Sequence, residues 1–389
     1  MHIALVGPST PAAFRRFVDS TDEFPAGFGG TPVNELGGAL LDAGHDVDLI
    51  TADPSLSRPW SAHGPRLRIE SVPFRTSARA RARDLFGAER AELAERLARV
   101  RADVVHAHWT YEFALAALAV RPDALVTAHD APVTILRHHR DRYRAVRLAM
   151  AALVRRRVRH LAVVSPYLAE RWRREMWWRG PVSVLPNIAP PLSTRETPPV
   201  LSVLTVGNAG PRKNVGTLLE AWPRIVSAVP SAHLDVVGPG LGPGDSLPRA
   251  LPATHRASVS FHGPVSRAEV DAHLRRATLL VHPSLEECHP MTVLEAMSAG
   301  VPVVGGRASG GVPWTLGDGT AGRLCDISHP GALAEAVIEL LSAPATAAAC
   351  AASARDRITE HYSASAIATR HLEVYDGLRR GTDIPKGVR

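Results

Sequence analysis

Short apolar segments alternate with helix-like segments along most of the chain, and this alternation limits the possible folds more than any other feature. Apolar runs of four or five residues bounded by turn residues predict buried strands. Strands that alternate with helices predict a doubly wound parallel sheet. In the first half of the chain the expected strands are residues 3–6, 47–51, 104–108, 125–129, 161–164 and 182–185.

A proline-rich stretch divides the alternation into two series. Residues 186–199 contain five prolines and no hydrophobic period, which indicates a linker. A second α/β series follows, with strands expected at 201–206, 234–237, 259–261, 278–281 and 301–304. The 389 residues therefore suggest an N-terminal domain 1–190, a linker 191–199, a second domain 200–360 and a C-terminal helix 361–389 that crosses back to the first domain.

Several classes of protein are disfavoured by what the sequence contains. No run approaches the ~18 apolar residues of a membrane span, and the start of the chain has no basic leader. Cys288, Cys325 and Cys350 form no C-x-x-C pair, so neither a disulfide framework nor a zinc site is indicated. We expect a cytoplasmic protein.

The net charge of +7 lies entirely in the first 190 residues, which hold 27 basic and 20 acidic side chains. Residues 137–179 alone carry 13 basic and three acidic residues, interleaved with Trp172, Trp177 and Trp178. Two interpretations remain open. The segment is either a solvated arginine-rich surface or a patch for an anionic partner such as a lipid headgroup, a phosphorylated acceptor or nucleic acid.

The segment 283–304 is the most informative for chemistry. A predicted strand ends before it, a loop carries Glu286 and Glu287, and a helix is expected from Met291 until Gly300 ends it. The start of that helix directs free amides and a positive dipole end at the loop, which favours phosphate binding. Glu287 and Glu295 can therefore hold different parts of one ligand, unless they are ordinary surface acids.

The spacing Glu287-x7-Glu295, followed by A-M-x-A-G-V-P-V-V, resembles the retaining glycosyltransferases of family 4 (GT4), which have the GT-B fold. Other landmarks of that family follow in order along some 300 residues. They are G-G at 29–30, G-H-D-V at 44–47, D-V-V-H-A-H at 103–108, T-A-H-D at 127–130, V-S at 164–165, P-N at 186–187, R-K-N at 212–214 and H-G-P-V at 262–265.

The resemblance implies two Rossmann-like domains with a cleft between them, the acceptor bound mainly by the first and the donor by the second. It implies transfer of a sugar from a nucleotide diphosphate sugar to an acceptor hydroxyl, with no cofactor and no metal. The residues that match the family's catalytic positions are Glu287, Lys213, Arg212 and His129. Those that match donor-binding positions are Gly29, Gly30, Lys213, Val265, Met291, Thr292, Val293 and Glu295, and His108 matches an acceptor position.

The implied partners are a nucleotide-sugar donor and a sugar, lipid-linked or natural-product acceptor, and no nucleic acid is expected. Peripheral contact with the inner face of the membrane through residues 137–180 stays open. The pattern departs from the family at Asn208, where an arginine is common, and in the loop after Glu287, which lacks the family's glycines. Alternatives are an epimerase or hydrolase on the same fold, or a non-catalytic protein that binds nucleotide sugars or nucleic acid.

Overall fold

The computed structural model describes residues 1–19, 23–191, 196, 201–247 and 253–381. The chain divides into two compact units. Unit 1 contains Met1–Ile188 and Ala364–Arg389, and unit 2 contains Ala189–Ser363. Most of the predicted linker, 191–199, lies outside the described residues.

Unit 1 is built on an eight-stranded sheet in the order β3-β4-β2-β1-β5-β6-β7-β8. All neighbouring strands are parallel except β3 and β4, which pair antiparallel. This hairpin was not predicted from the sequence; only residues 64–66 join its two strands, far too few for a parallel crossover. The strands are β1 (His2–Val6), β2 (Asp46–Asp53), β3 (Trp60–His63), β4 (Leu67–Pro73), β5 (Val104–His108), β6 (Leu125–Ala128), β7 (Leu161–Val163) and β8 (Val182–Val184).

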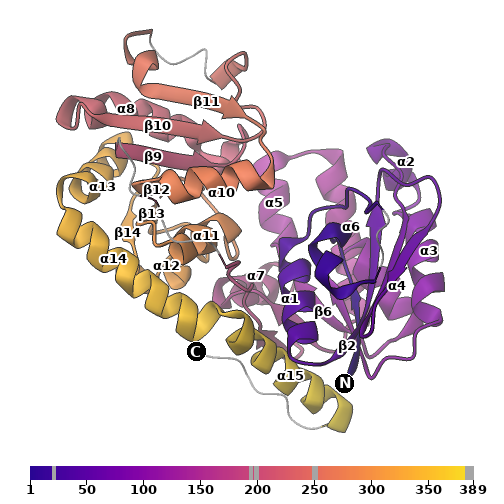
Figure 1. Ribbon diagram of the computed structural model, residues 1–389. Helices are drawn as coiled ribbons and strands as arrows, with labels where there is room; N and C mark the ends of the chain where they lie inside the picture. The colour runs from indigo at the N-terminus through magenta and orange to yellow at the C-terminus, as the bar shows by residue number, and fades with distance from the viewer. Residues whose placement is uncertain (20–22, 192–195, 197–200, 248–252, 382–389) are drawn as a thin grey trace. The chain divides into compact units, whose positions relative to one another are not determined.

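Helices cover both faces of this sheet (Figure 1). On one face, α1 and α15 pack together over β1 and β2, and Leu5, Leu40 and Tyr375 lie in their shared core. On the other face, α3 and α4 contact the same strands. The helices of unit 1 are η1 (Pro11–Phe17), α1 (Thr31–Asp42), α2 (Ala78–Arg83), α3 (Gly87–Ala98), α4 (Glu112–Val120), α5 (Pro132–His139), α6 (Arg142–Arg157), α7 (Pro166–Glu175) and α15 (Ala364–Arg380).

Unit 2 has a six-stranded, wholly parallel sheet in the order β11-β10-β9-β12-β13-β14. Its strands are β9 (Leu201–Val206), β10 (Ala232–Val237), β11 (Val259–Gly263), β12 (Leu279–His282), β13 (Val303–Gly306) and β14 (Arg323–Cys325). Its helices are η2 (Pro211–Lys213), α8 (Val215–Ala228), η3 (Ala253–Ser258), α10 (Arg267–Arg276), α11 (Met291–Ala299), α12 (Val312–Thr315), η4 (Gly317–Gly319), α13 (Pro330–Ser342), α14 (Pro344–Arg357) and η5 (Ile358–Tyr362).

Alternate residues of the central strands of unit 2 enter two separate cores. Val203 and Val281 pack with α8 and α13 on one face of the sheet. Leu204 and Leu280 pack with α10, α11 and α12 on the other face, so each strand is buried on both sides. The strands read as continuous apolar runs for this reason.

Both sheets confirm the predicted doubly wound α/β fold. In each sheet the strand order reverses next to the first strand of the unit, between β1 and β5 in unit 1 and between β9 and β12 in unit 2. Ligands of open parallel sheets bind beyond the carboxyl ends of the strands at such a reversal. The loops after these four strands are therefore where a site is expected.

Among the described helices, none is by itself both long and apolar enough to cross a membrane. One pair, Pro330–Ser342 with Pro344–Arg380, passes the same test of length and composition when taken together, but it is sharply bent at the break.

Candidate active site

In unit 2, the loops after β9 and β12 bring three of the predicted residues together. Arg212 and Lys213 lie in the short helix η2, between β9 and α8. The Lys213 Nζ lies 2.5 Å from Glu287 Oε1, and the Arg212 Nη1 lies 3.2 Å from Glu287 Oε2. The Arg212 guanidinium also donates to the carbonyl oxygen of Glu286 at 2.6 Å. Two cations thus share one carboxylate at the reversal point of the sheet.

These charges keep Glu287 ionised. Burial on its own raises the pKa of a carboxyl group, but His282, Lys213 and Arg212 together outweigh burial and hold the pKa of Glu287 well below its usual range. The His282 Nε2 is 3.7 Å from Glu287 Oε1, too far for a hydrogen bond, so its influence acts through charge and dipole. Glu287 is consequently an anion at neutral pH and does not donate a proton.

The helix α11 begins beside this cluster. Pro290 is its N-cap and Gly300, in the left-handed region at φ 73°, is its C-cap, so the helix spans Met291–Ala299 as predicted. The Val293 amide donates to the carbonyl of Pro290 at 3.1 Å. The Val293 amide therefore has an intrahelical partner, although the family resemblance placed Val293 among the donor-binding residues. The amides of Met291 and Thr292 remain in the first turn, where a helix supplies no acceptor.

Glu295, the second carboxylate of the motif, is held by a residue that the sequence analysis did not single out. Its Oε1 accepts a hydrogen bond from Arg267 Nη1 at 2.5 Å, and Arg267 also pairs with Asp271 at 2.9 Å. Burial raises the pKa of Glu295, and the attraction of Arg267 offsets this only in part. Arg267 is the first residue of α10 and follows the half-buried Val265 by two positions.

In unit 1, the glycine pair lies just before α1. Both residues are in the left-handed region, Gly29 at φ 76° and Gly30 at φ 81°. A side chain at Gly30 would meet the carbonyl oxygen of Pro8 at 1.8 Å, whereas one at Gly29 would meet nothing within 4 Å. Gly30 is the N-cap of α1, and Thr31 is the first helical residue.

The predicted histidines lie side by side, His108 as the last residue of β5 and His129 directly after β6. The His108 Nδ1 and His129 Nε2 share a hydrogen bond of 2.9 Å. His129 also stacks on Trp109, with ring centroids 4.1 Å apart. Burial lowers the pKa of His129 to about 3, so the ring is neutral at physiological pH. His106 is fully buried, with hydrogen bonds to Tyr375 and Thr127, so it packs within the sheet.

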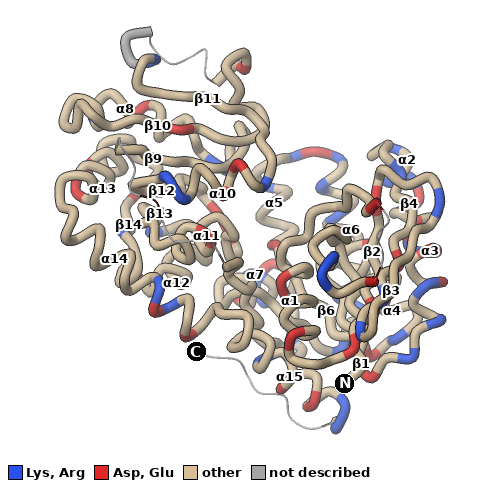
Figure 2. Tube along the Cα trace, viewed as in Figure 1, with Lys and Arg blue, Asp and Glu red and all other residues tan. Residues whose placement is uncertain are grey.

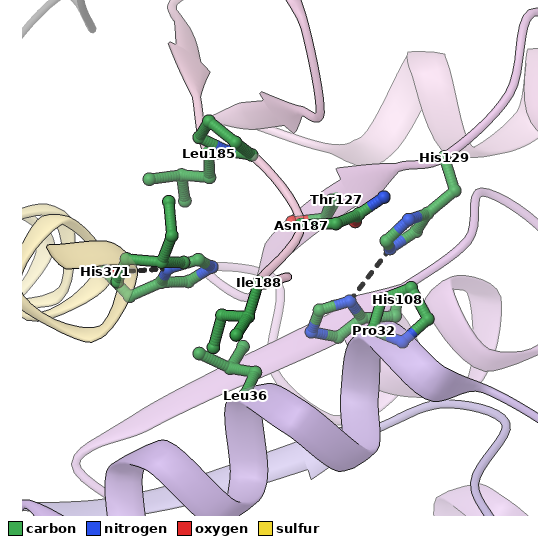
Figure 3. Close-up of a pocket in the computed structure, with 11 residues that line it drawn as sticks. Pro32, Leu36, His108, Thr127, His129, Leu185, Asn187, Ile188 and His371 are labelled. Carbon is green, nitrogen blue, oxygen red and sulfur yellow. Dashed lines mark hydrogen bonds between the residues drawn. The ribbon is translucent and has the colours of Figure 1, made fainter. Parts of the chain in front are cut away.

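Figure 3 shows His108 and His129 facing each other in a small pocket that α1, the Asn187 segment and His371 complete. The pocket holds about 10 Å³, room for one water and not for a sugar. His108 is only 2% exposed, and its Nε2 has no hydrogen-bond partner in the described structure. The geometry therefore favours His108 as a residue that positions His129, with His129 nearer the surface.

The basic segment 137–179 divides into core and surface. Trp172 is fully buried and Trp178 nearly so, whereas Trp177 is 67% exposed. Two of the three tryptophans are therefore core residues and not surface anchors. Figure 2 shows Lys and Arg positions recurring along the helices of unit 1, and among them Arg155 donates to the Trp177 carbonyl at 3.0 Å.

Two residues that contact the site were missed, and each had a weak signal. Arg267 follows Ser266, which forms a capping box with Glu269, a pattern that marks a helix start next to the H-G-P-V motif. His282 is the last residue of β12, at the carboxyl edge where ligand-binding side chains gather. Neither signal identifies the partner carboxylate, which lies in a different element.

Comparisons with known proteins indicate the family of the chain. Residues 30–190 match the family described as Glycosyltransferase Family 4, and residues 201–343 match the family described as Glycosyl transferases group 1. A phosphatidyl-myo-inositol mannosyltransferase of Mycolicibacterium smegmatis is 27% identical over 361 residues, 88% of each chain. A glycogen synthase of Mycobacterium tuberculosis is 30% identical over 184 residues, which are 47% of this chain and 44% of that one. The match therefore spans less than half the length of the glycogen synthase.

Solved structures share the fold. A sucrose-phosphate synthase from Thermosynechococcus elongatus superimposes with a TM-score of 0.74 at 22% identity, covering 98% of this chain and 100% of that one. The Anabaena HepE protein in complex with UDP superimposes with a TM-score of 0.66 at 16% identity, covering 97% and 100%. These likenesses establish the GT-B architecture of two Rossmann-like domains.

Proposed function

The chain belongs to the group 1, family 4 glycosyltransferases, and on that premise we propose that it moves a sugar from a nucleoside diphosphate sugar to an acceptor hydroxyl, with retention of the anomeric configuration. The observation that carries the proposal is the cluster of Lys213, Arg212 and Glu287 beside the start of α11. Preorganised cations and a helix N-terminus are the groups that stabilise a departing diphosphate.

The proposed reaction needs no protein acid. As the bond between the sugar C1 and the diphosphate oxygen breaks, negative charge grows on the diphosphate, and Lys213, Arg212 and the first amides of α11 stabilise it. The acceptor oxygen attacks C1 from the same face, and its proton passes to the leaving phosphate oxygen. Because Glu287 is ionised, its role is to accept hydrogen bonds from the donor sugar.

Two further groups position the donor in this scheme. Glu295 accepts the hydroxyl hydrogens of the ribose, which requires Arg267 to give up part of its contact with that carboxylate. His129, being neutral, offers a hydrogen bond to a sugar hydroxyl without adding charge. No resident cofactor takes part, and the transfer step uses no metal.

The donor and acceptor classes follow from the relatives' names. One relative, covering 88% of this chain, is a phosphatidyl-myo-inositol mannosyltransferase, and others are described as GDP-mannose-dependent. We therefore rank GDP-mannose and other nucleoside diphosphate hexoses first as donors. A lipid-linked or sugar acceptor in the synthesis of cell-envelope glycolipids or polysaccharides fits these names, and a natural-product acceptor is proposed from the resemblance alone.

A thermal-shift screen of nucleoside diphosphate sugars tests the donor class, because a ligand at 100 times its dissociation constant stabilises the folded protein by about 2.7 kcal/mol. With the best donor, Glu295→Ala is expected to cost roughly 2–4 kcal/mol of binding free energy, since two hydrogen bonds to a charged group are lost. Glu335→Ala, an exposed acid on α13 that pairs with Arg224, serves as the matched control. Unchanged donor affinity in Glu295→Ala would contradict the site. Turnover without any acceptor would indicate a hydrolase or epimerase instead.

A further inference from the structure

The edge of the unit 2 sheet has a polar face that the proposed reaction does not use. Along β10, Leu234 and Val236 enter the core, so Asp235 between them points to the opposite face. Along β11, Val259 and Phe261 pack on the same core, which turns His262 to the side of Asp235. Helix α10 follows β11 directly and brings His273 to this face.

Three metal-ligating side chains converge there. Among the described residues, Asp235, His262 and His273 are the only group whose ligand atoms all lie within 4.8 Å of one another. The Asp235 Oδ1 and His262 Nε2 are 2.8 Å apart, and the rings of His262 and His273 have centroids 4.5 Å apart. The other carboxylate oxygen, Asp235 Oδ2, accepts a hydrogen bond from Ser202 Oγ at 2.9 Å, which fixes the orientation of the group.

We propose that Asp235, His262 and His273 bind a divalent transition-metal ion of the zinc class. Two imidazole nitrogens and one carboxylate oxygen suit Zn²⁺ and its neighbours, whereas Mg²⁺ and Ca²⁺ prefer sites made of oxygen alone. The ligand atoms need to close in by a small side-chain movement, which His262 can make because its side chain is 31% exposed. Ser202 then acts as the outer partner that orients a ligating carboxylate.

The role of the ion is to hold the edge strand and its helix together. The three ligands come from β10, β11 and α10, so one ion ties the last strand of the sheet to the helix that follows it. The site shares no residue with the cluster of Arg212, Lys213 and Glu287, and the ion takes no part in sugar transfer. It is linked to the donor site through Val265 in the loop after β11 and through α10, whose first residue, Arg267, contacts Glu295.

Direct metal binding tests the proposal and does not depend on activity. The full chain, freed of any affinity tag and of metal by chelation, is titrated with Zn²⁺ by calorimetry and with Co²⁺ by visible absorption. One ion per chain is expected. His262→Ala and His273→Ala should each weaken binding by more than about 100-fold, and Ser202→Ala by about 10-fold, as for the loss of an outer-shell partner. His233→Ala is the matched control, because His233 bonds Ser260 on the same sheet but lies outside the cluster.

Hydrogen exchange locates the ion. Zn²⁺ is expected to slow exchange of the amides of residues 259–276 in the wild-type chain and not in His273→Ala. His262 lies on the surface, so His262→Ala tests the site even if His273→Ala does not fold. Absence of binding, or binding that survives His262→Ala with unchanged affinity, would overturn the proposal and leave the three side chains as a hydrogen-bonded network.

Discussion

The carboxyl ends of the two sheets carry opposite kinds of chemistry. In unit 2, Arg212 and Lys213 form ion pairs with Glu287 and help to hold its pKa well below the usual range. In unit 1, the equivalent edge holds the histidines His108 and His129, whose pKa values burial lowers so far that both rings are neutral. One fold class therefore supports a charged site and an uncharged one.

The difference fits the proposed function, in which the unit 2 edge binds the diphosphate and the unit 1 edge contacts sugar hydroxyls. A diphosphate brings two or more negative charges, and only fixed cations and helix dipoles compensate them once water is excluded. Sugar hydroxyls are neutral, so neutral donors and acceptors recognise them without the cost of burying a charge. The contrast predicts that removing a charge from the unit 2 site lowers turnover, whereas adding a charge to the buried histidines of unit 1 lowers the stability of the fold.

The largest effect is expected from Lys213→Ala. Loss of one preorganised charge typically costs on the order of 100-fold or more in turnover, and Arg212→Ala should behave in the same way. Steady-state kinetics with the best donor measure the loss, with Arg224→Ala as a control because Arg224 pairs only with the exposed Glu335 among its described ion pairs. Turnover is expected to persist in EDTA. A strict requirement for added divalent metal would contradict charge stabilisation by the protein alone.

The histidines of unit 1 give the next largest effect, as a loss of stability in acid. The pKa of His371 falls from 6.5 to about 4 through burial, so the folded chain binds fewer protons than the unfolded chain between those pH values. The contribution of the neutral His371 to the free energy of unfolding is complete above pH 6.5 and is lost as the pH falls toward 4. At about 1.4 kcal/mol per pKa unit this is on the order of 3 kcal/mol for His371.

Hydrogen exchange of unit 1 amides at a series of pH values measures this loss. His371→Leu should flatten the curve, whereas His329→Leu should not, because the His329 side chain is 74% exposed. The stability of unit 2 should decline less than that of unit 1 between pH 6.5 and pH 4. Burial also lowers the pKa of His282 in unit 2. The ion pairs that lower the pKa of Glu287, however, lose their stabilising effect only as the pH falls below 4.5, the ordinary pKa of a glutamate. Equal declines in the two units would remove the contrast.

The sequence predicted the helices and strands that carry the two sites better than it predicted the side-chain contacts between them. Helix α11 was placed correctly because Pro290 and Gly300 are local signals that end or begin a helix whatever surrounds them. The pairing of Lys213 with Glu287, 74 residues apart, depends on two loops meeting at the reversal of the sheet, which no local pattern records. The motif marked both residues as important without showing that they contact each other.

The misses have the same physical origin. The β3–β4 hairpin was overlooked because Trp60–His63 is a short strand with two exposed residues and no apolar run. Arg267 was overlooked because an arginine in a first helical turn is usually a surface residue, and only the packing of α10 on α11 brings it to Glu295. Burial and partner choice are properties of the packed molecule.

A smaller effect is expected from Arg267→Ala. Burial already raises the pKa of Glu295, and removal of the guanidinium takes away the attraction that lowers it. Glu295, the proposed ribose-binding carboxylate, would then protonate at a higher pH, and donor affinity would fall at a higher pH than in the wild type. Because Arg267 is nearly half exposed, its pair contributes at most about 1 kcal/mol, a change of up to about five-fold. Donor titrations at several pH values measure it, with Arg267→Lys as the charge-preserving control. Superimposable pH profiles would show that Arg267 does not act on Glu295.

The smallest difference concerns the basic surface of unit 1, which either faces an anionic partner or is covered by water alone. Residues 155–157 are three consecutive arginines at the end of α6, and nearby Trp177 is 67% exposed. An open groove of about 490 Å³ between α5 and α6 is lined by Val133 and Leu136 together with Arg137 and other arginines. Each arginine near an anionic membrane contributes about 1 kcal/mol, so three of them suffice for reversible recruitment.

Co-sedimentation with anionic and neutral vesicles, at low and high salt, separates the two outcomes. If the surface faces an anionic membrane or a lipid-linked acceptor, the wild-type chain binds anionic vesicles at low salt, and replacing Arg155, Arg156 and Arg157 by Gln weakens that binding. Replacing the exposed Arg379 and Arg380 of α15 by Gln is the control, since it removes two positive charges elsewhere on unit 1, against three in the triple variant. Equal and negligible binding to both vesicle types, with full activity in the triple variant, would leave an arginine surface that only water covers. The contrast between the two units would then rest on their sites alone.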